Sequence, residues 1–212
     1  MPYSLWLVPY DDSPFTKTTQ ELINDTVPRQ FLAEKDYQAF PPHVTLTSDV
    51  DLGGKSPQEW LDSLQFGEDY KPQHHEVLIE LDTVTAEDPK FRKMNISVKE
   101  NENLKKLAAS CRQQTHSVSA EQAQAWAKDE YRPHMSLLYA DVPTQDVERK
   151  IPLIEMKIGF AYGDLFACCG GSFSMGGLIT VVDTSSNETK DWKRVAQRET
   201  PWAMWRATRN LI

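Results

Sequence analysis

Two histidines of this chain, His43 and His134, stand in nearly identical local sequences. Residues 40–46 and residues 131–137 both read aromatic, any residue, Pro, His, apolar, Thr or Ser, Leu. Side chains of an extended strand point alternately to its two faces, so each histidine would share a face with the hydroxyl residue two positions later. The apolar residues of each segment would anchor the strand in a core. Brought face to face, the two segments would form a symmetric site.

Imidazole and hydroxyl groups placed together suit acid–base chemistry at phosphorus. Imidazole titrates near neutral pH, so one histidine can take a proton from water while the other donates one to a leaving oxygen. The hydroxyl groups of Thr45 and Ser136 can donate hydrogen bonds to an anionic oxygen and stabilise the charge that develops in the transition state. The motifs contain no obvious nucleophile and require no metal or cofactor. They therefore predict in-line attack of water on a phosphodiester.

A lone histidine in a strand is more often a structural residue than a catalytic one. Independent structural histidines have no reason to share five flanking features, so the duplication favours catalytic roles for His43 and His134. The other histidines lack this context. His74, His75 and His116 are therefore expected on surface loops or connections.

The paired motifs also resemble those of a known family. The H-x-T and H-x-S pattern, with Leu137-Leu138-Tyr139 after the second motif, resembles the two-histidine (2H) phosphoesterases. Within them it is similar to the fungal and plant cyclic phosphodiesterases, which open nucleoside 2′,3′-cyclic phosphates. The opening residues 3–9, Tyr-Ser-Leu-Trp-Leu-Val-Pro, are similar to the first strand of that group. One such motif carries little information, whereas two of them on a chain of the expected length are fairly specific.

The resemblance implies roles for five residues. His43 and His134 would share the general acid and general base roles. Thr45 and Ser136 would hold the non-bridging phosphate oxygens. Tyr139 would lie close enough to touch the phosphate or another part of the substrate.

The implied activity is hydrolysis of a nucleoside 2′,3′-cyclic phosphate to the 2′-phosphate, and of ADP-ribose 1″,2″-cyclic phosphate to ADP-ribose 1″-phosphate. Trp6 or Phe40 could stack on a base, although core packing is the more frequent role of such residues. Two alternatives remain open. One is a 2H relative that trims RNA 3′ ends or seals 2′,5′ linkages, and the other is a catalytically silent module that binds RNA ends in the same groove.

The composition is that of an ordinary globular protein with an acidic balance. The 212 residues are 40% hydrophobic and 25% charged, and 23 basic against 31 acidic residues give a net charge of −8. That charge would repel a long phosphate backbone, so we expect a small cyclic-phosphate nucleotide rather than duplex nucleic acid as the partner. No apolar run approaches the roughly 20 residues of a membrane span, and the N-terminus lacks a signal-peptide pattern. A cytoplasmic location is therefore expected, with the oligomeric state and association with a membrane compartment left open.

Alternation and capping patterns predict the elements that position the motifs. Strands are expected up to Pro9, at both motifs, at residues 77–81, 94–98, 153–158 and 178–182, and from Trp192 to Glu199 as the last strand. Helices are expected after Ser13, after Ser56, across residues 104–111, and near residues 119–128 and 143–151. Residues 202–206 would form a helix or pack irregularly, and Gly176 and Gly177 would mark a bulge or close packing.

Strands and helices mix without strict alternation, and each half of the chain carries one motif. This order predicts an α+β fold. The resemblance to the 2H family implies a bilobal form of it, in which two antiparallel sheets with outer helices face each other across a central cleft. We therefore expect residues 1–212 to form a single bilobal domain with both motifs lining the cleft.

Overall fold

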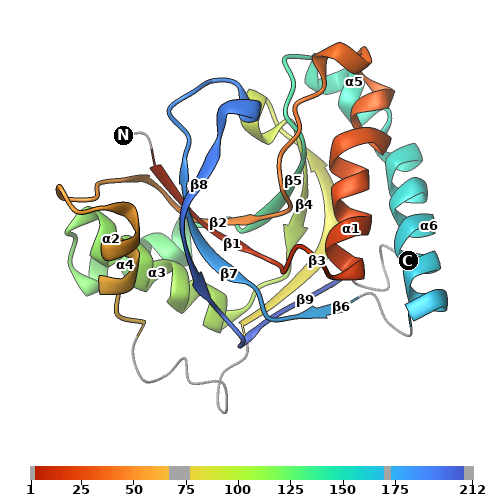
Figure 1. Ribbon diagram of the computed structural model, residues 1–212. Helices are drawn as coiled ribbons and strands as arrows, with labels where there is room; N and C mark the ends of the chain where they lie inside the picture. The colour runs from red at the N-terminus through yellow and green to blue at the C-terminus, as the bar shows by residue number, and fades with distance from the viewer. Residues whose placement is uncertain (1–2, 67–76, 170–172, 208–212) are drawn as a thin grey trace.

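A curled sheet organises the computed structural model, which describes residues 3–66, 77–169 and 173–207 (Figure 1). Within those ranges the sheet has nine strands in the order β6-β9-β3-β4-β5-β2-β1-β7-β8. Their bounds are β1 (Tyr3–Val8), β2 (Val44–Val50), β3 (Val77–Ala86), β4 (Met94–Val98), β5 (His134–Leu138), β6 (Phe173–Met175), β7 (Leu178–Asp183), β8 (Lys193–Glu199) and β9 (Ala203–Ala207). The predicted mixture of helices and strands is confirmed.

Two groups of helices flank the sheet. The described ranges hold six α-helices, namely α1 (Pro14–Glu21), α2 (Pro57–Ser63), α3 (Glu102–His116), α4 (Ala120–Asp129), α5 (Thr144–Glu148) and α6 (Ile151–Cys169). Short turns add η1 (Leu22–Thr26), a π-helix, and the 3-10 helices η2 (Pro28–Gln30), η3 (Glu34–Asp36), η5 (Lys90–Arg92) and η6 (Thr189–Asp191). In Figure 1, α1 and α6 lie side by side on one flank, and α2, α3 and α4 gather on the other. None of the helices in the described ranges combines the length and apolar character needed to cross a bilayer.

Side-chain caps explain where several helices begin. Ser13 accepts a hydrogen bond from the backbone N–H of Thr16 at 3.0 Å, and Pro14 occupies the first helical position of α1. Ser56 and Ser119 start α2 and α4 with capping boxes. Each of these starts was predicted from the sequence and is confirmed.

Two predicted elements are wrong. Residues 153–158 were expected to be extended, but they lie inside α6. The buried residues Ile154, Ile158, Tyr162 and Leu165 follow a helical period, but exposed apolar residues on the other side of the helix hide that period in the sequence. Residues 202–206 were expected to form a helix or to pack irregularly, but residues 203–207 form β9, which pairs in parallel with β3. The strand predicted from Trp192 to Glu199 is therefore not the last one.

The predicted pair of separate sheets is not confirmed, because the described strands form one sheet. The two motif strands, β2 and β5, are its central neighbours and are paired through a single register position, Val44 with Met135. This seam joins a set of strands around β1 and β7 to a set around β3 and β4. It also brings the two motifs together.

Candidate active site

The seam places each histidine beside the other motif. His43 directly precedes β2, and His134 is the first residue of β5. In this antiparallel pair, Val44 lies opposite Met135. The register therefore places His43 opposite Ser136 and Thr45 opposite His134. Each histidine therefore lies across from the hydroxyl residue of the other motif. The symmetric arrangement predicted from the sequence follows directly from this register.

Both imidazoles are held by the same backbone contact. The Nδ1 atom of His43 lies 2.7 Å from the carbonyl oxygen of Pro41, and the Nδ1 atom of His134 lies 2.9 Å from that of Arg132. A carbonyl oxygen only accepts hydrogen bonds, so Nδ1 must carry the proton in each ring. The Nε2 atom of each histidine is thereby left to accept or donate a proton in the site.

The ring of His43 is enclosed by aromatic residues. Trp6 stacks on it, with ring centroids 3.7 Å apart and an interplanar angle of 12°. The hydroxyl group of Tyr139 lies 3.4 Å from Nε2 of His43, where it can donate a long hydrogen bond. These contacts fix the ring plane and direct Nε2 toward Tyr139.

Burial sets the charge of His43. Burial lowers the pKa of His43 from the ordinary value of 6.5 to about 4. The hydrogen bond to the carbonyl oxygen of Pro41 raises the pKa, but this effect is smaller than that of burial. The positive charges of His134 and Arg194 lower the pKa further. The imidazole of His43 is therefore neutral at neutral pH.

His134 lies among charged groups. Burial lowers its pKa, the hydrogen bond to Arg132 raises it, the charge of Arg92 lowers it and that of Glu87 raises it. Glu87 in turn accepts hydrogen bonds from Arg92 at 2.8 Å and from the amide of Asn95 at 3.0 Å. The charges of Arg92 and Glu87 thus shift the pKa of His134 in opposite directions.

The hydroxyl residues lie on the same strands. Ser136 is buried and hydrogen-bonded to Tyr139, whose pKa is raised by burial despite that bond, so the phenol keeps its proton. Thr45 is half-buried on β2, and its carbonyl oxygen accepts a hydrogen bond from the hydroxyl group of Tyr131 at 3.1 Å. Tyr131 is the aromatic residue that opens the second motif, so the second motif helps to position the first.

Aromatic rings build one wall of the site. Trp6 and Phe40, which the sequence suggested as stacking residues, are almost fully buried against His43. Phe40 also stacks on Tyr139, with centroids 4.0 Å apart. Phe91 and Trp192 are only half-buried, and their ring centroids lie 5.5 Å apart. Both rings pack against Tyr139. These two rings are the better placed to meet a ligand.

Comparisons of the sequence with known proteins point to one family. The family of cyclic phosphodiesterase-like proteins matches residues 1–200. A Neurospora crassa protein named 2′,3′-cyclic-nucleotide 3′-phosphodiesterase is 29% identical over 212 residues, covering 92% of this chain and 97% of its own. A Phaeosphaeria nodorum protein of the same name is 32% identical over 201 residues, with the same coverage of both chains.

The chain belongs to the cyclic phosphodiesterase-like family. The resemblance predicted from the two motifs is confirmed. Every motif residue of this cyclic phosphodiesterase-like protein lies in the described part of the chain.

The sequence motifs did not reveal the charged surroundings of the histidines. Arg92 and Glu87 belong to the connection between β3 and β4, and Arg194 belongs to β8. None of them stands in a repeated or recognisable pattern. Asn95 carries a weak signal, because it is a polar residue that alternates with apolar ones on a strand predicted to be half-buried.

Other candidate positions fall outside the site. Among the described residues, no three His, Cys, Asp or Glu side chains lie close enough together to hold a metal ion. His116, predicted at the surface, is half-buried at the end of α3 and contacts the carbonyl oxygen of Ser48 at 2.9 Å. His74 and His75 lie outside the described residues. A hollow of about 1020 Å³ between α3 and α4 is lined by none of the motif residues.

Proposed function

We propose that this protein hydrolyses nucleoside 2′,3′-cyclic phosphates to nucleoside 2′-phosphates by paired-histidine acid–base catalysis. One observation carries the proposal. The two motif histidines flank the seam, and each has Nδ1 bonded to a backbone carbonyl so that Nε2 is left for proton transfer. Two imidazoles oriented in this way can serve as base and acid on opposite sides of one phosphorus atom.

The reaction begins with the activation of water. Nε2 of one histidine takes a proton from water as the water oxygen forms a bond to phosphorus. Nε2 of the other histidine donates its proton to the ester oxygen that leaves, and the bond between that oxygen and phosphorus breaks. Because burial keeps His43 neutral, we assign the base role to His43 and the acid role to His134.

The hydroxyl groups complete the site. Thr45 and Ser136 would donate hydrogen bonds to the non-bridging oxygens, where negative charge increases in the transition state. Tyr139 keeps its phenolic proton and would donate it in a hydrogen bond to the phosphate. Arg92 and Arg194, whose charges reach the two imidazoles, add positive potential around the bound anion.

The relatives' names support the choice of the bond that breaks. They are named 3′-phosphodiesterases of 2′,3′-cyclic nucleotides. A site that holds the five-membered ring in one orientation aligns only one ester oxygen with the attacking water. We therefore propose that the 3′ oxygen leaves. Hydrolysis of ADP-ribose 1″,2″-cyclic phosphate to ADP-ribose 1″-phosphate is a second proposed reaction of the same centre.

The test is a turnover assay with product identification. Purified protein is incubated with adenosine 2′,3′-cyclic phosphate, and the product is compared by chromatography and phosphorus NMR with authentic 2′- and 3′-phosphates. We expect the 2′-phosphate alone. A mixture of isomers, or the 3′-phosphate alone, would show that the substrate lies differently, and absence of turnover would disprove the enzymatic proposal. ADP-ribose 1″,2″-cyclic phosphate is assayed in parallel.

A further inference from the structure

Helix α6 carries much of the apolar surface that the protein exposes. Of the seven large apolar side chains exposed in the described ranges, four belong to this helix, namely Leu153, Met156, Phe160 and Phe166, with 38%, 52%, 66% and 58% of their surface exposed. The other side of the helix, with Ile154, Ile158 and Tyr162, packs in the core. In Figure 1, α6 lies beside α1 on one flank of the molecule. It therefore presents a second apolar face, directed away from the core.

The spacing of residues on this face is that of a coiled-coil seam. The residues Leu153, Met156, Phe160, Gly163 and Ala167 follow one another at intervals of three, four, three and four positions. This heptad spacing keeps one narrow stripe of a helix directed at a neighbouring helix. A helix that only covers a core needs no such stripe on its solvent side. The exposed stripe of α6 therefore fits a second helix.

The stripe is divided into a half with large side chains and a half with small ones. Leu153, Met156 and Phe160 form the N-terminal half, and Gly163 and Ala167 belong to the C-terminal half. Two copies packed antiparallel about a twofold axis near Phe160 place the large half of each helix over the small half of the other. A parallel pair would set small residues against small ones and leave a gap. The stripe is thus complementary to a reversed copy of itself.

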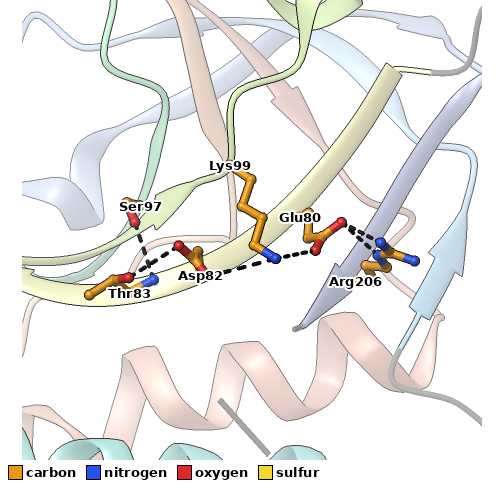
Figure 2. A network of polar contacts seen from close by, with 6 residues as sticks. All are labelled: Glu80, Asp82, Thr83, Ser97, Lys99 and Arg206. Carbon is orange, nitrogen blue, oxygen red and sulfur yellow. Dashed lines mark hydrogen bonds and ion pairs between the residues drawn. The ribbon is translucent and has the colours of Figure 1, made fainter. Parts of the chain in front are cut away.

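The charges beside the stripe fit the same arrangement. Lys157 and Asp164 are one heptad apart and lie along the same side of the stripe. An antiparallel copy brings Lys157 of each helix to Asp164 of the partner subunit. Neither side chain has a hydrogen-bond or ion-pair partner among the residues that the structure describes. By contrast, Glu80, Lys99 and Arg206 on the sheet pair with one another within the chain, as Figure 2 shows.

The exposed area matches the centre of a weak homodimer. If each of the four side chains presents about 200 Å² when fully exposed, their exposed fractions correspond to roughly 400 Å² of apolar surface. Each partner of a standard interface contributes about 800 Å², of which the rim is polar. The stripe would supply the apolar centre and the charged residues would supply part of the rim. We therefore expect a dissociation constant in about the micromolar range.

A lipid surface is a less suitable occupant of this face. Helices that lie on membranes carry lysine and arginine beside their apolar side. The exposed charged residues of α6 are Glu155 and Asp164, and the chain has a net charge of −8. Anionic head groups would repel these carboxylates, whereas a second copy supplies Lys157 to each Asp164.

We propose that the protein self-associates through α6 as an antiparallel homodimer with its twofold axis near Phe160. The inference does not rest on the proposed function. Helix α6 packs mainly against α1 and β3, whereas the motif residues lie on or beside β2 and β5. Dimerisation should therefore leave the turnover of each subunit unchanged.

Sedimentation equilibrium from micromolar to millimolar protein measures the association. We expect the wild type to convert reversibly from monomer to dimer. Phe160→Glu should raise the dissociation constant by at least about tenfold, because two carboxylates would meet near the axis. The matched control is Phe173→Glu, which places the same charge at an exposed phenylalanine of β6 and should leave the dissociation constant unchanged. A wild type that stays monomeric at millimolar concentration, or a Phe160→Glu variant that dimerises like the wild type, would overturn the proposal.

A mixing experiment tests the antiparallel order. Lys157→Glu and Asp164→Lys should each weaken self-association by about tenfold, because each turns both reciprocal pairs into pairs of like charge. A one-to-one mixture of the two variants should associate like the wild type, because both carboxylates of the first variant then face lysines of the second. A mixture that associates no better than either variant alone would contradict the proposed pairing.

Two further measurements distinguish dimerisation from other causes. At nanomolar concentration the chain is monomeric, so the urea midpoint and the turnover should be the same for the wild type and these variants. If a variant is less stable there, recovery in the mixture still decides the pairing. Flotation with vesicles of phosphatidylcholine and phosphatidylserine tests lipid as the occupant. Vesicle binding that Phe160→Glu abolishes, by a wild type that stays monomeric in solution, would assign the face to lipid and overturn the proposal.

Discussion

Each motif imidazole is oriented by the carbonyl oxygen two residues before it. The proline that precedes each histidine has no N–H and a fixed φ, so the short segment is stiff before the ring is attached. The Pro-His pair of each motif therefore helps to fix the orientation of the imidazole ring. The repeated motif was sufficient to predict that the two histidines share one setting, because the local chain itself supplies the contact that orients each ring.

The histidines are expected to dominate turnover. His43→Ala and His134→Ala should each lower kcat by about 10²- to 10⁴-fold, because each removes a proton-transfer group. Thr45→Ala and Ser136→Ala should lower it by about 10- to 10³-fold, as for other donors to a developing anion. Steady-state assays on adenosine 2′,3′-cyclic phosphate measure these losses, and thermal melting shows whether each variant folds.

A matched control separates the site from general effects of losing a histidine. His116→Ala removes a half-buried imidazole that contacts the backbone of β2 outside the site. Its kcat should stay close to that of the wild type. Wild-type turnover in either motif variant would refute the paired-histidine mechanism.

The pKa values predict an acidic pH optimum. Catalysis needs one protonated and one neutral imidazole, and that form is most populated between the two pKa values of the free enzyme. The pKa of His43 is about 4 and that of His134 is lowered from 6.5, so kcat/KM should peak below pH 6.5. A pH profile of kcat/KM in constant ionic strength tests this, and a maximum at or above pH 7 would contradict it.

At the scale of elements, local signals predicted the helix starts and the motif strands, but not α6 or β9. Cap residues act on their own backbone within a few positions, so Ser13, Ser56 and Ser119 could be recognised from sequence. The extended form of residues 203–207 depends on pairing with β3, which is far away in the chain. Such long-range contacts override local propensity.

The assignment of α6 can be tested by comparing two positions. In a strand, residues 156 and 158 would share a face, whereas in α6 Ile158 is fully buried and Met156 is 52% exposed. We expect Ile158→Ala to lower the free energy of unfolding by about 2–5 kcal/mol. Met156→Ala should change it by less than about 0.5 kcal/mol. Urea denaturation measures both values, and similar losses for the two variants would contradict the helix.

At the scale of the whole molecule, charge is distributed unevenly. The chain carries a net charge of −8, yet arginines from β8 and η5 act on the two imidazoles. Neither arginine could be assigned to the site from the sequence, because η5 and β8 meet it only through the arrangement of the sheet. The net charge of the chain therefore does not describe the charges that surround the two histidines.

The mechanism requires no metal, and this too can be measured. Proton transfer is assigned to imidazoles rather than to a metal-bound water. Turnover of adenosine 2′,3′-cyclic phosphate should therefore be unchanged after dialysis against EDTA. Loss of activity that a divalent ion restores would argue for a metal-activated water instead.

The position of β9 has a consequence for how the protein is made. In the sheet, β9 lies between β3 and β6, although β3 precedes it by more than a hundred residues. Until residues 203–207 have been synthesised, the backbone edge of β3 that pairs with β9 is unpaired, and β6 lacks its described neighbour. A nascent chain halted before residue 203 would expose two unpaired backbone edges, which are sites of aggregation and of chaperone binding. Completion of this side of the sheet therefore has to follow the synthesis of residues 203–207.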